Sequence, residues 1–347
     1  MLGGFGILAW LLMARLPFME APLVGSLTAW LSSLFIIAAS AHFGASYHLA
    51  YCDGRAAVRR SPIPLVVVPI ALLVAAGVVI VLTATRAVDS ASWLTRALLI
   101  VVFSATGWHY IKQAYGVAML SLRLRGIEVR RSDVKILRYG FYPIWFVDLM
   151  DVWARGSRAF YRRYDVGVGL LPQWAEQATR LTAIGFVVAV LVTLVRVARR
   201  SGARPPMGAW APYVSGALWF VLPPTVGGAA AMIGLTHALQ YLACVHPAEM
   251  GLARARGERQ LLHWWLSVFG GAIAGGVLVG RYLPMILNRS TASLALPDVA
   301  ATMLFVGLNL HHYALDASMW RSGGQHVRRI TAEAPARPRP VTQPATA

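Results

Sequence analysis

Ionisable side chains interrupt several of the long apolar stretches of this 347-residue chain. The most polar interruption lies at 309–316, where the adjacent His311 and His312 are followed by Asp316. An ionisable group inside a bilayer is costly to keep, so such residues mark functional sites by default. We therefore expect these interruptions to meet at one intramembrane site. Three earlier stretches carry histidines of their own: His42 with His48, then His109, then His237.

These six histidines are candidate metal ligands. Imidazole nitrogen suits iron, copper and zinc. His311 and His312 point about 100° apart on a helix, so one of the two is expected to face the site. Iron(II) is the metal we expect, with haem b, copper or zinc as alternatives. The familiar signatures HExxH, CxxC and the glycine-rich phosphate loop do not occur in the sequence. The simpler alternative for each histidine is a hydrogen bond between membrane helices.

Further polar side chains follow the histidines by one helical turn. Residues three or four positions apart share a helix face. An amide, phenol or carboxylate on that face can orient an imidazole or a bound water, and an ammonium can contact a substrate. The alternative for Lys112 is snorkelling towards the membrane surface. The predicted site residues are Lys112 and Gln113 beside His109, Gln240 and Tyr241 beside His237, and Asp316 beside His312.

Composition places these stretches in a membrane protein. Hydrophobic residues make up 57% of the chain and charged residues 13%, whereas soluble domains carry about a quarter charged residues. We predict an all-α, polytopic transmembrane bundle of about ten spans, because runs of about 20 apolar residues recur along the chain. The floor is seven, since the three shortest runs can be interfacial or re-entrant. The short runs are 3–16, 139–153 and 208–222; the others are 24–51, 62–84, 93–121, 177–198, 225–246, 261–283 and 296–319.

Basic residues cluster in the loops between the apolar runs. The net charge is +18, from 32 Lys and Arg against 14 Asp and Glu. Because cytoplasmic loops carry such an excess, both termini are predicted to be cytoplasmic, in a bacterial inner membrane. The basic loop 155–163 falls on the opposite side in this arrangement. The partners we expect are the lipid bilayer, with its anionic headgroups, and a lipophilic small molecule rather than nucleic acid. The sequence leaves the oligomeric state open.

All four histidine stretches fall on even-numbered predicted spans, which run in the same direction through the membrane. The next cytoplasmic arginine follows each stretch at a similar offset. At a rise of about 1.5 Å per residue, these offsets differ by only about 12 Å. The histidines are therefore predicted to share one layer in the cytoplasmic half of the bilayer.

The chain is predicted to be one membrane domain, 1–320, with a basic, Pro- and Ala-rich tail, 321–347, that is expected to be disordered. The apolar start, 1–16, lacks the basic region and cleavage pattern of a signal peptide and is expected to be retained. Two cysteines, Cys52 and Cys244, do not make a disulfide framework.

Two short motifs resemble the Brp/Blh family of membrane β-carotene dioxygenases. The stretch 41–44, Ala-His-Phe-Gly, is similar to a His-Phe-Gly-like motif of that family. The helical stretch that begins at His237 is similar to a second motif, with Tyr241 where the family has another histidine. The family's early Pro-His-Gly-x-x-Asp motif is absent. Because that family places single histidines on separate membrane helices around an iron ion, the resemblance implies a ligand role for His42 and His237.

Three functions are compatible with these observations. The first is a membrane-embedded, metal-dependent oxidoreductase or oxygenase acting on a lipophilic substrate such as a polyisoprenoid, carotenoid or fatty acyl chain. The second is a haem-b electron-transfer protein with histidines from facing helices as axial ligands. The third is a transporter or channel with a path lined by His, Lys and Asp. Convergent intramembrane imidazoles favour the first, and the lack of an inverted repeat argues against the third.

Overall fold

The chain is helical throughout almost all of the part that the structure describes. This computed structural model describes residues 21–52, 54–85, 87–154, 160–161, 164–165, 168–218, 229–278, 295–320 and 327. The one exception to helices and loops in that part is a two-residue antiparallel ladder between β1 (Phe160–Tyr161) and β2 (Tyr164–Asp165). The prediction of an all-α fold is confirmed. The predicted span 3–16 and, apart from residue 327, the tail 321–347 lie outside the described residues.

Most of the helices overlap the predicted apolar runs, but several of them begin or end at residues other than those predicted. Span 139–153 contains a helix boundary at Gly140. In the described part of span 261–283, residues 261–278, short helices are joined by the π-helical segment Leu266–Gly271. A second π-helical segment, Ile63–Val67, leads into α4. The bounds are α2 (Ala21–Tyr51), α3 (Arg55–Arg60), α4 (Val68–Ala84), α5 (Val88–Leu124), α6 (Arg131–Tyr139), α7 (Tyr142–Ala154), α8 (Gln173–Arg200), α9 (Met207–Gly216), α10 (Ala229–Arg256), α11 (Glu258–Trp265), α12 (Ala272–Val277) and α14 (Ala295–Met319).

Three helical stretches within the described residues are long and apolar enough to cross a membrane: Ile63–Ala84, Ala91–Leu124 and Trp174–Arg200. Their outward faces carry large apolar side chains, such as Leu73 on α4 and Leu181 on α8, which are 72% and 70% exposed. Large contiguous apolar surface is rare on soluble monomers and is typical of surface that meets lipid or a partner. These helices associate the fold with a membrane.

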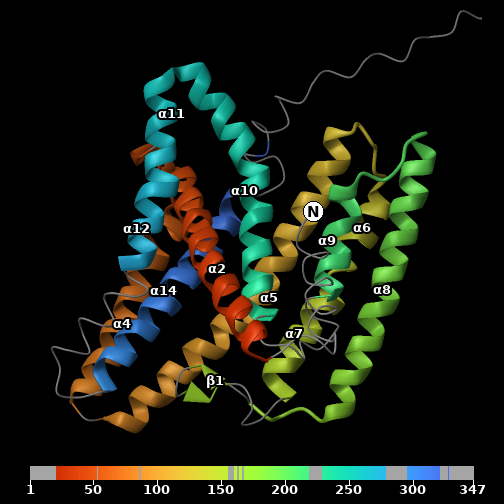
Figure 1. The fold of residues 1–347 in the computed structure, drawn as a ribbon. Coiled ribbons are helices and arrows are strands. Elements are labelled where there is room, and N and C mark those ends of the chain that lie inside the picture. The colour runs from red at the N-terminus through yellow and green to blue at the C-terminus, as the bar shows by residue number, and fades with distance from the viewer. Residues whose placement is uncertain are drawn as a thin grey trace, which may run out of the picture.

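Four helices, α2, α5, α10 and α14, form the centre of the fold (Figure 1). Helix α2 packs along α10 and contacts α14, while α5 contacts both α14 and α10, so the four close a ring. Outer helices support this ring on each side. Helix α4 packs on α14 and α5, the segment from 266 to 277 packs on α2, and α7 and α9 pack on α5, with α8 behind them. The ring is what positions the histidines.

Gly44 and Gly107 are two of the glycines that let helices near the ring approach closely. A Cβ atom on Gly44 of α2 would collide with the Cβ atom of Ala272 in α12 and would lie 3.0 Å from the Val268 carbonyl oxygen. A Cβ atom on Gly107 of α5 would collide with the carboxylate of Asp148 in α7. Small residues at such contacts let membrane helices approach closely.

Helix α6 is amphipathic and is fixed to the end of α8 by ion pairs. The buried carboxylate of Asp133 accepts a hydrogen bond from Arg196 at 2.7 Å and another from Arg200. Burial alone would raise the pKa of Asp133, but the hydrogen bonds and positive charges of Arg200 and Arg196 outweigh it and hold the pKa below its usual value. The basic end of α8 is thereby tied to the loop region that follows α5.

Candidate metal centre

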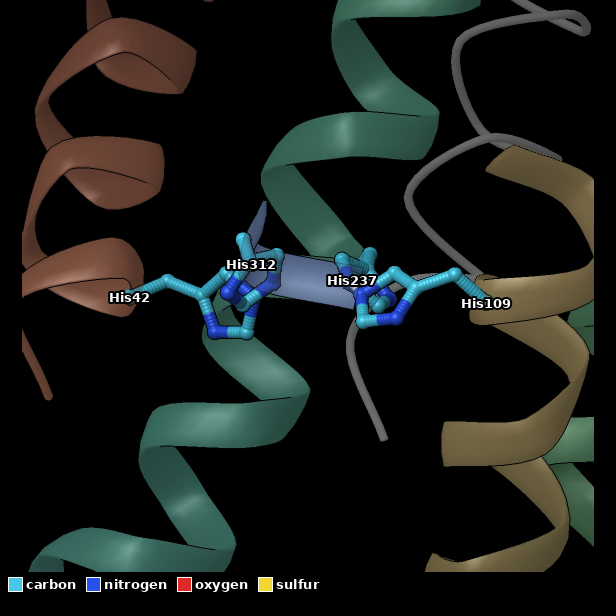
Figure 2. Close-up of side chains that lie close together, drawn as sticks. All are labelled: His42, His109, His237 and His312. Carbon is cyan, nitrogen blue, oxygen red and sulfur yellow. Dashed lines mark hydrogen bonds between the residues drawn. The ribbon is translucent and has the colours of Figure 1, made fainter. Parts of the chain in front are cut away.

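Four histidines converge at the centre of the helix ring (Figure 2). Each comes from a different helix, and each is buried. One ring nitrogen of each lies within 4.8 Å of the corresponding nitrogen of every other. Figure 2 shows the four imidazoles at one level along the helices, as the sequence predicted for these positions. The four are His42 on α2, His109 on α5, His237 on α10 and His312 on α14.

The imidazoles form two close pairs. The Nε2 atoms of His42 and His312 are 2.8 Å apart, and those of His109 and His237 are 3.0 Å apart. Metal–imidazole bonds of about 2.0–2.1 Å place neighbouring ligand nitrogens about 2.8–3.4 Å apart and opposite ones about 4.0–4.2 Å apart. The two pairs match neighbouring ligands. The widest separation, up to 4.8 Å, has to close by about half an ångström or slightly more. The set thus fits one transition-metal ion.

An aromatic ring covers each of the four imidazoles, and the covering ring always comes from the next helix around the ring of helices. Two of these contacts, those of Tyr313 and Tyr110, are stacked at 24° and 25° between planes. Such ring pairs restrict rotation of the imidazole and keep its outer edge away from lipid. The pairs, with centroid distances, are Phe43 of α2 on His312 at 4.3 Å, Tyr313 of α14 on His109 at 4.5 Å, Tyr110 of α5 on His237 at 4.0 Å and Tyr241 of α10 on His42 at 4.2 Å.

A second polar layer lies one helical turn beyond the histidines. Each of the four histidines is followed, four positions later on its own helix, by a residue that shares its face. These four residues are Ser46, Gln113, Tyr241 and Asp316. Their side chains connect the helices of the ring, because Ser46 Oγ lies 2.9 Å from Tyr241 OH and 3.1 Å from Asp316 Oδ1. Gln113 Nε2 donates to the carbonyl oxygen of His237 at 2.9 Å and contacts Gln240 Oε1 at 3.3 Å.

Asp316 is the carboxylate that approaches the histidines. Its Oδ2 atom is 3.6 Å from His312 Nε2 and 3.8 Å from His109 Nε2. Its other oxygen accepts the hydroxyl of Ser46. Since a serine hydroxyl has one proton and a carboxylate only accepts, the phenol of Tyr241 completes the chain as a donor to Ser46 when Asp316 is ionised. Within the described part of the chain, the Nδ1 atoms of His42, His237 and His312 have no hydrogen-bond partner.

Three predicted site residues, His311, His48 and Lys112, lie outside both the four-histidine cluster and the second polar layer. The Nε2 atom of His311 lies 3.1 Å from the Pro64 carbonyl oxygen, which only accepts, so this nitrogen carries the proton. Its Nδ1 atom therefore accepts the hydroxyl of Tyr47 at 2.9 Å. His311 thus ties α14 to α2 and to the π-helical segment. His48 instead lies near His263, with 6.1 Å between ring centroids. Lys112 is exposed, with its Nζ atom 5.3 Å from the Trp108 ring.

Of the four covering rings only Tyr241 was among the predicted site residues; Phe43, Tyr110, Tyr313 and Ser46 were not. Two signals in the sequence point to them. Three of the four clustered histidines are followed directly by Phe or Tyr, at Phe43, Tyr110 and Tyr313. All four have a polar residue four positions later. A repeated His-x-x-x-polar pattern on four separate apolar helices would have identified both polar layers.

Comparison of the chain with protein-family models, with curated proteins and with solved structures found no match. The function of the chain is therefore inferred from the geometry and chemistry of the site.

Proposed function

We propose that the protein is an integral membrane metalloprotein that uses a four-histidine iron(II) centre for oxidoreductase or oxygenase chemistry on a lipophilic substrate. One observation carries this proposal, the convergence of four buried ring nitrogens from four helices within 4.8 Å. The ordinary packing of apolar helices does not require four imidazoles at one point, because each buried polar group costs about 1–3 kcal/mol when its partners are missing.

The donor set supports a transition metal. Neutral imidazole is a common ligand of iron, copper and zinc and a poor match for calcium or magnesium. Four nitrogens leave one or two positions of a five- or six-coordinate ion open for a further ligand, dioxygen or substrate. A redox-active ion there would supply the electron transfer and oxygen chemistry that protein side chains lack. The chain itself would hold the ion, exclude water with the covering rings, and orient the site through the second polar layer.

A lipophilic substrate follows from where the centre lies. The four histidines sit between helices whose outer faces are apolar, so a molecule dissolved in the bilayer has the shortest route to them. Polyisoprenoid, carotenoid and fatty acyl chains are of this kind, and the motif resemblance to the Brp/Blh family points to the same class. As part of the proposal, the chain crosses a bacterial inner membrane about ten times with both termini in the cytoplasm.

The geometry favours a bare ion over haem b. A bis-histidine haem needs two imidazoles on opposite sides of a flat macrocycle. Here all four imidazoles crowd the centre, with the rings of His42 and His237 only 5.1 Å apart and those of His109 and His312 only 4.8 Å apart. Additional side chains cover each ring from outside. A porphyrin between any two of these histidines would displace the other two.

Passage of a metal ion is the second candidate function, because polar groups lie on both sides of the histidine layer. Ser46 and Gln113 lie on one side. On the other, the hydroxyls of Thr106 and Tyr313 are 2.9 Å apart, and Asn309 contacts Tyr313 at 3.3 Å. A transported ion would exchange with the medium. A resident cofactor would stay through purification.

Metal analysis of the purified protein tests the proposal. We expect about one iron per chain after detergent extraction and size-exclusion chromatography, and no Soret band. His312→Ala should lose the metal, while His263→Ala, a matched change at an exposed histidine, should keep it. Oxygen uptake with carotenoid or polyisoprenoid substrates then tests the activity. Metal-free wild-type protein that remains active would contradict the proposal, and rapid exchange of the ion with added chelator would favour passage.

A further inference from the structure

We infer that Asp316 is a fifth ligand of this centre, bound through Oδ2, so that the centre is a four-histidine, one-carboxylate site. The inference rests on the proposed metal site and adds to it a residue from the second polar layer. Its basis is the position of one oxygen atom relative to the four imidazoles, the anchoring of the other oxygen, and the charge that a buried cation requires.

The Oδ2 atom faces the metal-binding edges of the histidines. It lies 3.6 Å from His312 Nε2 and 3.8 Å from His109 Nε2. These two histidines belong to different close pairs, so Oδ2 approaches both pairs. The two distances fall between the separations of neighbouring and opposite ligands, about 3.0 and 4.2 Å for bonds of about 2.1 Å. A shift of a few tenths of an ångström would bring Oδ2 within bonding distance of the same ion.

A carboxylate that only orients a histidine occupies a different place. It accepts a hydrogen bond from the ring nitrogen that does not bind the metal, on the far side of the imidazole. For His312 that atom is Nδ1, and within the described residues it has no hydrogen-bond partner. Asp316 instead approaches Nε2, the atom that points to the centre. Its position is that of a ligand.

The remaining oxygen is held as expected for a carboxylate that binds through one atom. Ser46 Oγ lies 3.1 Å from Asp316 Oδ1, and Tyr241 OH lies 2.9 Å from Ser46 Oγ. The three residues come from α14, α2 and α10, so the carboxylate is fixed by two helices other than its own. A ligand carboxylate is ordinarily hydrogen-bonded in this way, which restrains its direction. Ser46 acts through Asp316 and is a positioning residue.

Charge also favours ligation by Asp316. Four neutral imidazoles bring no charge to compensate a divalent cation, and a buried, uncompensated charge is strongly disfavoured. Bound to the ion, one carboxylate lowers the net charge of the centre from two to one. Asp316 is itself buried, so the ion and the carboxylate each supply the counter-charge that the other lacks.

Cobalt(II) is a suitable probe because its visible absorption reports coordination number. Apo protein in detergent is titrated with cobalt(II), and the spectrum and the dissociation constant are measured for wild type, Asp316→Asn, Asp316→Glu and Ser46→Ala. We expect a five-coordinate spectrum for wild type. Asp316→Asn should give the stronger absorption of a four-coordinate ion and a dissociation constant raised at least about 100-fold, while Ser46→Ala should raise it about 10-fold.

Two further variants separate ligation from folding. Asp316→Glu keeps the carboxylate and should restore the five-coordinate spectrum at reduced affinity. Asp298→Asn removes an acidic group from the first turn of the same helix and should leave spectrum and affinity unchanged. An unchanged spectrum in Asp316→Asn, together with loss of cobalt in His312→Ala, would overturn the fifth ligand and leave the four-histidine centre standing. Wild-type protein that binds no cobalt would overturn both.

Discussion

The Nε2 atoms of His42 and His312 lie 2.8 Å apart, although 270 positions separate the two residues in the chain. His42 is on the first described helix, and His312 is on the last of the four central helices. The ring of α2, α5, α10 and α14 is therefore closed by the contact between its first and last members. The imidazoles meet only if the whole ring is assembled, so the site reports correct folding of most of the chain.

The covering rings give a prediction about Tyr313. Tyr313→Phe keeps the ring on His109 and loses only the hydroxyl contacts, so metal affinity should change little. Tyr313→Ala removes the ring, lets the imidazole of His109 rotate, and should weaken metal binding by about 10-fold or more. Competitive titration with a chelator of known affinity measures both variants. Equal weakening by the two changes would place the effect in the hydroxyl and contradict the proposed role of the ring.

A second prediction concerns the contact of α2 with α12. Gly44→Ala puts a methyl group against Ala272 and the Val268 carbonyl, and should destabilise the protein by about 1–3 kcal/mol, because neither neighbour has a flexible end that can move aside. The matched change Gly116→Ala meets nothing within 4 Å and should be neutral or stabilising by up to about 1 kcal/mol. Denaturant unfolding in mixed detergent micelles measures the free energy of unfolding of both variants and of wild type. A Gly44→Ala variant as stable as Gly116→Ala would show that α2 and α12 are not in close contact.

The ion pairs of α6 predict a pH dependence. The pKa of Asp133 is lowered in the folded protein, so its contribution to stability is fully present above its unfolded pKa of about 3.9 and is lost as the pH falls through the folded pKa. Asp133→Asn should therefore cost about 1–3 kcal/mol at pH 7, where two charge-assisted hydrogen bonds are lost, and the difference from wild type should shrink as the pH falls below the unfolded pKa.

Thermal unfolding at several pH values tests this, with Arg199→Gln as the control. Arg199 is exposed and adjacent to Arg200, and its loss should change stability by less than about 0.5 kcal/mol. A difference between Asp133→Asn and wild type that stays constant down to pH 3 would contradict the ionised pair.

Cysteine labelling tests the proposed orientation. Cys52 is exposed at the end of α2, next to basic residues that the positive-inside rule places in the cytoplasm. A membrane-impermeant maleimide should label it in inside-out vesicles and fail to do so in right-side-out vesicles. Cys52→Ser provides the background from Cys244, which is partly buried. Labelling confined to right-side-out vesicles would invert the topology.

The all-helical fold and the meeting of the four central histidines could be predicted from the sequence, for a physical reason. Imidazoles are rare enough in apolar helices that each one stands out, and His42, His109, His237 and His312 occupy equivalent depths along helices that run together. The pairing of Asp316 with the face of His312 also followed from helix periodicity alone. These features depend on one helix at a time.

Features that depend on how neighbouring helices pack could not be predicted from the sequence. His311 and His312 are equally polar, and only the packing of α14 between α2 and α5 turns His312 to the centre and His311 to Tyr47. Lys112 follows His109 by nearly one turn but is rotated far enough to reach the outer surface beside Trp108. The order of helices around the ring decides which aromatic residue covers which histidine, and no periodicity within one segment carries that order.

X-ray absorption at the metal edge of the purified protein is the sharpest test of the four-histidine centre. We expect one iron per chain with a first shell of about five nitrogen and oxygen atoms near 2.0–2.2 Å and the outer-shell scattering of several imidazoles. His311→Ala should leave this spectrum intact, because His311 faces Tyr47, whereas the neighbouring change His312→Ala should abolish it. A spectrum without imidazole scattering, or one that is lost in His311→Ala and kept in His312→Ala, would contradict the four-histidine centre.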